Sequence, residues 1–295
     1  MTTIFGVPLA AMFGQLLLGL INGAFYALLS LGLAVIFGLL RIINFTHGAQ
    51  YMLGAFASLL LLKYLGIGYW PTLFLAPLLV GGIGILIERY LLRRIAHLDH
   101  LYGLLLTFGL AMMIEGSFIN LFGVSGSSYP IPESLQGGIK LGFMFLPTYR
   151  LWVLAAGLGM CLFTWYMIEK TRLGAYLRAG TEKPALMQAF GVNVPLLTTL
   201  TYGFGVALAA FAGALAAPIY SVSPTMGSNL LIVVFAVVVI GGMGSIMGAI
   251  VTGVSMGLIE GLTKVYWPES ASTVIFFVMI LVLLVRPNGL FGKEA

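Results

Sequence analysis

Residues 10–40 read AAMFGQLLLGLINGAFYALLSLGLAVIFGLL, a stretch without a single charged side chain. The hydrocarbon core of a bilayer is about 30 Å thick, and a helix of about 20 apolar residues crosses it. The stretch is longer than that. It therefore predicts a helix whose natural solvent is lipid rather than water.

The composition extends this interpretation to the whole chain. Of the 295 residues, 60% are hydrophobic and only 8% are charged, and the mean hydropathy is +1.08. Soluble domains carry roughly 25% charged residues, so this chain could not cover a folded surface in water. Its length allows about eight to ten membrane helices in a single transmembrane domain, residues 1–295. The net charge of +5 does not indicate nucleic acid, because the chain has no basic stripe with interleaved aromatic residues.

Further apolar stretches follow the first, and helices are the elements that fit them. The alternating pattern of a membrane β-barrel, in segments of about ten residues, is absent. The sequence therefore predicts an all-α polytopic membrane protein with about eight to ten transmembrane or broken helices. The further stretches lie at 49–62, 71–88, 101–122, 150–168, 197–219, 230–240, 246–263 and 271–285.

Lysine and arginine predict which loops face the cytoplasm, because cytoplasmic loops carry an excess of both. We expect 89–100, 169–196 and the C-terminus inside, and 123–149, with only Lys140, outside. The side of the N-terminus stays open, since the first 40 residues carry no charged side chain. The cations behind this assignment are Arg89, Arg93, Arg94, Lys170, Arg172, Arg178, Lys183, Arg286 and Lys293.

Two places interrupt the apolar pattern. One holds Arg41 and the polar patch 44–50, and the other is the glycine segment 241–245. Each has an apolar arm, 49–62 and 230–240, too short to cross the bilayer alone. Interrupted segments in corresponding halves of a transporter point to broken helices at a substrate path. The substrate-path candidates are Asn44, Thr46, His47, Gln50, Gly241, Gly242, Gly244 and Ser245.

Each interruption also has a structural interpretation. The patch could be a short cytoplasmic turn in which Asn44 and Thr46 cap the next helix. The glycines could serve close helix packing, and we favour packing with a break superimposed. A shared glycine spacing, 48 to 54 and 242 to 248, makes an internal repeat possible. His47 has no second histidine nearby, so no metal site is predicted.

Ionisable residues inside the spans are few. Glu115 lies in the stretch 101–122, where an ionised carboxylate costs about 2.5–3.5 kcal/mol. We expect it to face the bundle interior and to be paired or neutral. Glu260 and Lys264 are four residues apart in the favourable orientation, which predicts an ion pair at the surface.

No motif in the sequence indicates a catalytic site. Residues 253–257, GVSMG, match the G-x-S-x-G pattern of hydrolases, but they lie in an apolar helical run and no histidine follows them. The phosphate-binding pattern G-x-x-x-x-G-K-[ST] does not occur. We therefore expect no catalytic residue and no cofactor in this chain, and any ATP dependence would come from a partner.

Residues 171–195, TRLGAYLRAGTEKPALMQAFGVNVP, are the most informative stretch outside the spans. Pro184 suits the first position of a helix, and Gly191 suits its stop. A short helix from about Thr181 to Gly191, more apolar than a solvated loop, predicts an element that docks on a partner. The alternative is a plain connection. The residues assigned to docking are Glu182, Pro184, Ala185, Met187, Phe190 and Gly191.

A set of motifs in fixed order carries a family resemblance over nearly the whole chain. They are NG (22–23) with YAL (26–28), INFTHG (43–48), YMLGA (51–55), LTFG (106–109), Gly174 with RA (178–179), FGVN (190–193), GGMGS (241–245) and RPNGLFG (286–292). Together they resemble the permeases of high-affinity branched-chain amino acid ABC importers.

This resemblance implies partners and a mechanism. A second, related permease would pair with this chain as a heterodimer, two cytoplasmic ATPases would bind ATP and magnesium, and an extracytoplasmic binding protein would deliver the substrate. The complex would lie in the bacterial inner membrane. Residues 182–191 look like the family's coupling motif, although Pro184, Met187 and Gln188 depart from it and leave the start of the coupling helix open.

Two rival functions remain at this level. A related ABC importer would carry urea or short amides, because selectivity in such systems lies largely in the binding protein. An ion-coupled secondary amino acid transporter would need ionisable residues inside the membrane, and Glu115 is the candidate that this sequence offers.

Overall fold

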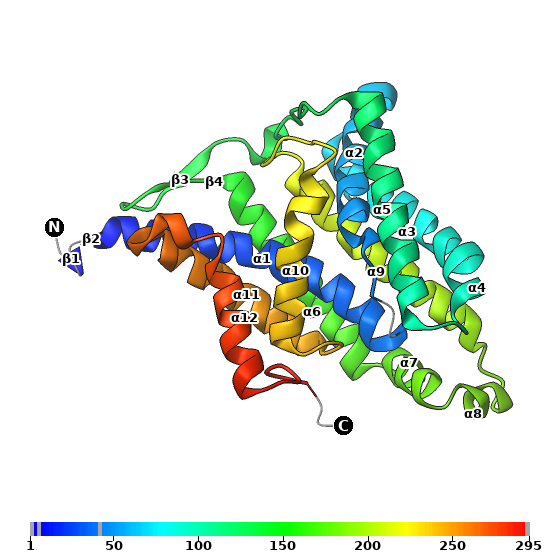
Figure 1. The fold of residues 1–295 in the computed structure, drawn as a ribbon. Coiled ribbons are helices and arrows are strands. Elements are labelled where there is room, and N and C mark those ends of the chain that lie inside the picture. Colours follow the sequence, from blue (N-terminus) through cyan, green and yellow to red (C-terminus); the bar gives the residue numbers. More distant parts are fainter. Residues whose placement is uncertain (1–2, 5–6, 41–42, 293–295) are drawn as a thin grey trace. The chain divides into compact units, whose positions relative to one another are not determined.

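The computed structural model describes residues 3–4, 7–40 and 43–292, and helices account for most of them (Figure 1). This confirms the predicted all-α class. The main helices are α1 (Leu9–Leu40), α2 (Thr46–Leu65), α3 (Tyr69–Ile87), α5 (His100–Phe122), α6 (Thr148–Lys170), α9 (Val194–Ala216), α10 (Met226–Gly241), α11 (Ile246–Tyr266) and α12 (Val274–Val285).

Shorter elements join these helices. A π-helix, η1 (Glu88–Leu92), and one turn of helix, α4 (Arg93–Ile95), continue α3. The remaining elements are η2 (Glu133–Leu135), α7 (Arg172–Glu182), α8 (Pro184–Ala189), η3 (Pro268–Ser270) and two antiparallel strand pairs, β1 (Thr3–Ile4) with β2 (Val7–Pro8) and β3 (Gly138–Lys140) with β4 (Phe145–Pro147).

The membrane segments agree with the predicted eight to ten. Within the described residues, six helices are long and apolar enough to cross a membrane, namely α1, α3, α5, α6, α9 and α11. α10 and α12 are shorter apolar helices. The apolar arm 49–62 is part of α2, whose 20 residues include the polar patch from Thr46 to Gln50, and α2 is not among these six helices. Two cations named above, Arg41 and Lys293, lie outside the described residues.

The chain divides into two compact units. The first consists of Met1–Ser30, Pro130–Cys161 and Ile232–Ala295, and the second of Leu31–Tyr129 and Leu162–Leu231. The chain passes from one unit to the other inside α1, α6 and α10. The expectation of a single domain over residues 1–295 stays a prediction.

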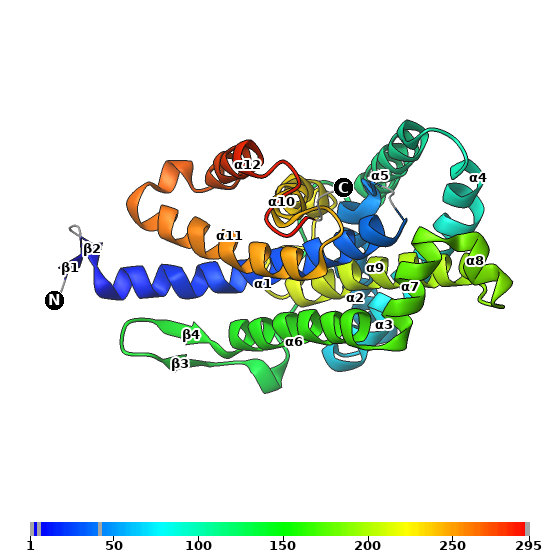
Figure 2. The same cartoon turned by 90° about the horizontal axis from the view of Figure 1, so that it is seen from below.

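In the first unit, α11 packs along the first part of α1 at backbone contact (Figure 2). A Cβ atom on Gly257 would lie 2.3 Å from Gly23 Cα, and one on Gly253 would lie 2.4 Å from Ala27 Cα. Both distances are shorter than any real contact of a Cβ atom. The G-x-S-x-G pattern at 253–257 therefore serves helix packing, in the small-residue manner of membrane helices.

In the second unit, α9 packs against both α2 and α3 (Figure 1). A Cβ atom on Gly213 of α9 would lie 2.0 Å from Tyr51 O of α2. One on Gly84 of α3 would lie 2.8 Å from a methyl group of Val206 in α9. Small residues thus bring three helices together, and the large side chains of Tyr51 in α2 and Tyr202 in α9 are fully buried.

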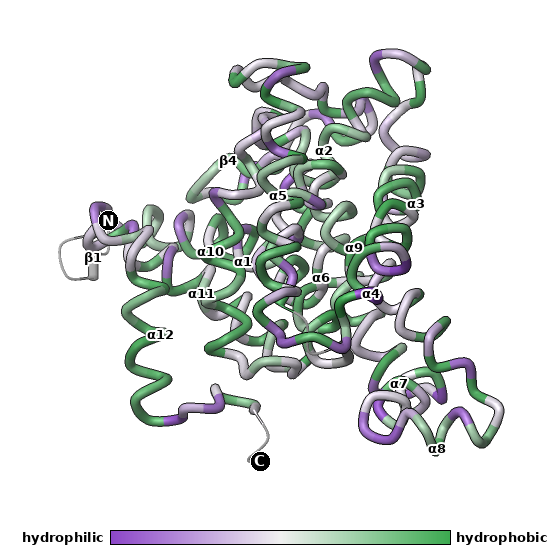
Figure 3. Tube along the Cα trace, turned by 45° about the vertical axis from the view of Figure 1, so that its right-hand side comes forward, coloured by the Kyte–Doolittle hydropathy of each residue, from purple (hydrophilic) through white to green (hydrophobic). Residues whose placement is uncertain are grey.

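The two ends of the second unit separate the loops as the charge pattern predicts. At one end, Arg93 of α4 donates to Pro195 O at the start of α9, directly after α7 and α8. At the other end, Ser127 forms a β-bridge with Val222. Hydrophilic residues are prominent on α7, whereas α3 is mainly hydrophobic (Figure 3). The two loops predicted inside therefore share one end of the unit, and the loop after α5 lies at the other.

Candidate functional site

The polar patch before α2 closes into a hydrogen-bonded cluster. Asn44 Nδ2 donates to Gln50 Oε1 at 3.1 Å, and Gln50 Nε2 donates to the Thr46 hydroxyl at 3.1 Å. Asn44 Oδ1 accepts the backbone N–H of Thr46 at 3.1 Å and also its hydroxyl. All three side chains are 0% exposed. The amide and hydroxyl groups therefore satisfy one another inside the unit, where an unpaired polar group would be unfavourable.

This geometry bears on both interpretations of the patch. It is a turn between two helices in which Asn44 accepts the first N–H group of α2, but the N-cap residue is Phe45, which has no side-chain cap. Thr46 does not cap the backbone, because its hydroxyl bonds to side chains. The turn is buried rather than exposed. A role in the substrate path stays a prediction, and the chemistry on offer there is hydrogen bonding by neutral groups.

Two residues that the sequence did not single out tie the patch to other helices. The Tyr202 hydroxyl of α9 accepts from Gln50 Nε2 at 3.4 Å. Thr107 Oγ1 of α5 accepts the N–H of Phe45 and donates to Ile43 O, both at 3.2 Å. The signal for Thr107 was its place in the motif at 106–109. Tyr202 carried no comparable signal.

His47 is a packed side chain in this structure. It is 1% exposed, and a Cβ atom on Gly32 of α1 would lie 3.0 Å from its Cε1 atom. The imidazole therefore fills the space that the glycine of α1 leaves free. Its place in a substrate path stays a prediction.

The glycine segment 241–245 is a break between two helices. Gly242 and Gly244 have φ values of 96° and 86°, which favour glycine. Ser245 Oγ accepts the N–H of Gly248 at 3.0 Å and caps α11. A Cβ atom on Gly248 would lie 2.2 Å from Gly241 O. The favoured interpretation, packing with a break superimposed, is confirmed.

The C-terminal motif at 286–292 docks on this turn, which the sequence did not predict. The N–H of Leu290 donates to Ile240 O at 2.8 Å, and that of Phe291 donates to Gly241 O at 3.1 Å. Carbonyl groups at the end of a helix need such partners. Two glycine-rich motifs, 241–245 and 286–292, therefore form one structure in the first unit.

The two groups of substrate-path candidates belong to different units. The patch 44–50 lies in the second unit and the glycine turn 241–245 lies in the first. Their approach to each other around a substrate path stays a prediction, as does an internal repeat.

The segment 171–195 folds into two helices where one was predicted. Lys183 separates α7 from α8 with φ −136° and ψ 68°, because the residue before a proline is driven out of the helical region. The predicted helix start at Pro184 is confirmed. Thr181 and Glu182, however, belong to α7. A Cβ atom on Gly174 would lie 1.6 Å from Ile168 O, so this glycine allows α7 to follow closely on α6.

α8 ends as predicted and is exposed. Gly191 has φ 81°, and its N–H donates to Gln188 O at 2.9 Å. No residue of α8 is buried. Leu186 is 50% exposed, and Phe190, directly after the helix, is 75% exposed. Exposed apolar side chains outside the spans fit a docking element, and the identity of what docks there stays a prediction.

The ionisable residues inside the spans differ from expectation in part. Glu260 and Lys264 form the predicted ion pair, with Nζ 2.5 Å from Oε1. The predicted surface position is wrong for Glu260, which is 8% exposed and also accepts from the Tyr26 hydroxyl at 2.7 Å. Glu115 is half-buried on α5, and among the described residues no cation pairs with it.

Comparisons with known proteins match most of the chain to one family of membrane permeases. The family "Branched-chain amino acid transport system / permease component" matches residues 15–284. The chain is 31% identical to the high-affinity branched-chain amino acid transport system permease protein BraD of Pseudomonas aeruginosa, with 95% of each chain covered. It is equally 31% identical to the permease protein LivH of Escherichia coli K12, again with 95% of each covered.

A second permease from the same organism is also similar. The high-affinity branched-chain amino acid transport system permease protein LivM of Escherichia coli K12 is 27% identical, over 90% of this chain and 67% of LivM. No solved structure matches this chain.

Proposed function

Because this chain belongs to the family of branched-chain amino acid transport permease components, we propose that it translocates branched-chain amino acids across the bacterial inner membrane. It is a multi-pass membrane protein and a permease component, not an enzyme. A binding protein outside the membrane delivers the substrate in this proposal, and alternating access moves it through the permease.

The proposal assigns the energy source to partner subunits. The chain has no G-x-x-x-x-G-K-[ST] motif, so two cytoplasmic ATPases would bind ATP and magnesium. A second, related permease completes the membrane part. Support for a heterodimer comes from Escherichia coli K12, in which LivH and LivM both carry the permease name and both resemble this chain.

The exposed helix α8 is the observation that carries this function best. It lies outside the spans, it has no buried residue, and the chain then presents Phe190 to the surroundings. A plain connection of this length has no reason to keep large apolar side chains in water. A large aromatic side chain that enters a pocket of a partner supplies much of the binding energy of an interface. An ATPase that binds α8 could therefore move α9, which follows α8 in the chain.

The proposal also assigns the side of the N-terminus. Ile43 and Phe45, just after α1, bond to Thr107, which lies near the His100 end of α5. That end is the cytoplasmic one by the charge rule. α1 is a single helix of 32 residues, so it would start on the opposite side. The N-terminus is thus proposed to lie outside.

Uptake by the reconstituted complex tests the substrate. The permease pair, both ATPases and the binding protein are placed in vesicles with ATP, and uptake of labelled leucine and of labelled urea is measured in parallel. We expect leucine to enter and urea to stay out. Uptake of urea alone would move the chain to an importer of short amides.

A further inference from the structure

A guanidinium group joins the ends of α3 and α9 on the side of α8. Glu88, the first residue of η1, has a side chain that is 4% exposed. Arg93 grips its carboxylate with two donors, Nε to Oε1 at 3.4 Å and an Nη atom to Oε2 at 3.2 Å. Such two-point contacts fix orientation as well as distance.

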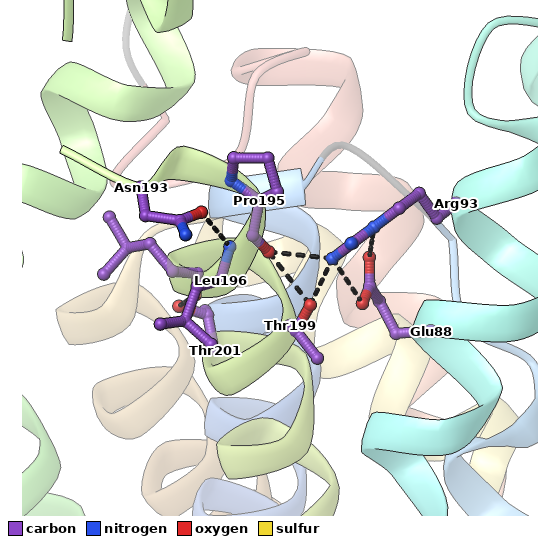
Figure 4. A network of polar contacts seen from close by, with 8 residues as sticks. Glu88, Arg93, Asn193, Pro195, Leu196, Thr199 and Thr201 are labelled. Atoms are coloured by element: carbon purple, nitrogen blue, oxygen red, sulfur yellow. Dashed lines mark hydrogen bonds and ion pairs between the residues drawn. The ribbon is translucent and has the colours of Figure 1, made fainter. Parts of the chain in front are cut away.

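The same Arg93 also holds the first turn of α9 (Figure 4). Its Nη atom lies within hydrogen-bond distance of Pro195 O, at 2.8 Å, and of the Thr199 hydroxyl. That hydroxyl in turn donates to Pro195 O at 2.9 Å. One side chain thus connects a buried carboxylate after α3 with the backbone of α9.

The π-helix makes this connection possible. In an α-helix of 3.6 residues per turn, residues five apart point about 140° away from each other. The wider turn of η1 (Glu88–Leu92) instead brings Glu88 and Arg93 to the same side. π-helical turns are rare and are frequent at functional sites.

The contacts of Arg93 lie at the end of α9 that is nearest to α8 along the chain, where a movement of α8 would first reach the membrane helices. α9 starts at Val194, shortly after α8 ends at Ala189, and Asn193 caps it by accepting the N–H of Leu196 at 3.0 Å. A displacement of α8 would therefore move Pro195 before most other residues of α9. Without Arg93, that displacement could fray the first turn of α9 instead of moving the helix.

Beyond Arg93, the packing carries a movement further into the unit. α3 and α9 touch at backbone contact, since a Cβ atom on Gly81 would lie 3.1 Å from Gly203 O. Tyr202, three residues after Thr199, bonds to Gln50 in the polar cluster of α2. The distance along α9 from Pro195 to Tyr202 is about 10 Å.

We propose that Arg93 is a positioning residue for energy coupling: it locks the first turn of α9 to Glu88, so that a displacement of α8 moves α3 and α9 together. This inference rests on the proposed function. It assigns Arg93 no contact with the substrate or with ATP. Its loss should separate ATP hydrolysis from transport while the complex stays assembled.

The test measures leucine uptake and ATP hydrolysis in the same vesicles, with the complete complex. In Arg93→Gln we expect the ratio of leucine transported to ATP hydrolysed to fall about tenfold. Thr199→Val keeps the ion pair but loses one contact, so its ratio should fall less. The matched control is Thr201→Val, because the Thr201 hydroxyl bonds to Leu197 O of its own helix. The control should keep the parental ratio.

A double variant separates positioning from stability. Arg93→Gln leaves Glu88 as a buried carboxylate without its partner, and the complex could fail to assemble for that reason alone. Glu88→Gln with Arg93→Gln removes the buried charge but also the lock. We expect this double variant to assemble and to remain uncoupled. Recovery of the parental ratio would overturn the inference, since the pair would then serve only stability.

The outcomes also distinguish the inference from its premise. A parental complex without ATP-driven uptake would overturn the proposed function, and this inference with it. Parental uptake together with an unchanged ratio in the double variant and in Thr199→Val would overturn the inference alone.

Discussion

At the residue scale, the buried cluster at the start of α2 depends on one amide. Gln50 accepts from Asn44 and donates to Thr46 and Tyr202. Gln50→Leu leaves buried polar groups without these partners, which should lower the free energy of unfolding by about 1–3 kcal/mol. The midpoint of thermal unfolding of the purified permease measures this. Gln188→Leu, on exposed α8, is the control, and equal midpoints for both variants would contradict the account.

The sequence predicted the residues of this cluster that lie before and in α2, but not their partners on α5 and α9. Asn44, Thr46 and Gln50 stood out because they are polar residues in an apolar region. Their partners do not follow from local pattern, since Thr107 is 62 residues from Phe45 and Tyr202 is 152 residues from Gln50. A threonine or tyrosine in an apolar helix is common, and only the fold shows which one faces the cluster.

At the scale of elements, the contact between α2 and α9 depends on the absence of a side chain. A Cβ atom on Gly213 would lie 2.0 Å from Tyr51 O. Gly213→Ala should therefore force the two helices apart and destabilise the fold by about 1–3 kcal/mol or more. Gly109→Ala, where a Cβ atom would meet nothing within 4 Å, is the matched control. The yield of folded permease after solubilisation should fall in the first variant only.

The exposed end of α8 supplies a second prediction at this scale. Phe190→Asp places a charge on the proposed docking surface, and Gly191→Pro forbids the φ of 81° that ends the helix. Both should abolish ATP-driven uptake although the protein still inserts in the membrane. Phe190→Leu, which stays apolar, should retain most of it. Co-purification of the ATPases checks the cause, and full binding with parental uptake in both variants would reduce α8 to a connector.

The sequence analysis recognised the signals of α8 and missed that of α7. Pro184 is the first residue of α8, and Gly191, with its positive φ, follows its last turn. In α7 the buried positions are Gly174, Leu177 and Gly180. Leu173, Tyr176 and Leu177 nevertheless recur at the spacing of one helix face, so the sequence did carry a signal for α7.

At the scale of the whole molecule, the order of spans and loops predicts a labelling pattern. Ser128, after α5, and Gln188, on α8, are both exposed. The native Cys161 is buried and should give little background. In intact spheroplasts, an impermeant thiol reagent should label Ser128→Cys and leave Gln188→Cys unlabelled until the cells are opened. Labelling of Gln188→Cys from outside would reverse the assignment.

Hydropathy predicted the spans well because lipid imposes one requirement on every membrane helix. It could not predict the division into two units or the docking of residues 286–292 on the glycine turn. Those features depend on which small residues face each other across helices. Hydropathy records that a residue avoids water, and it does not record the partner.

The source of energy tests the central claim most directly. Vesicles that contain this permease and its partners receive leucine outside, with ATP inside or with a proton or sodium gradient instead. The account predicts uptake with ATP in the absence of any ion gradient, and loss of that uptake in Phe190→Asp. Uptake driven by an ion gradient without ATP would contradict it and would make the chain a secondary transporter.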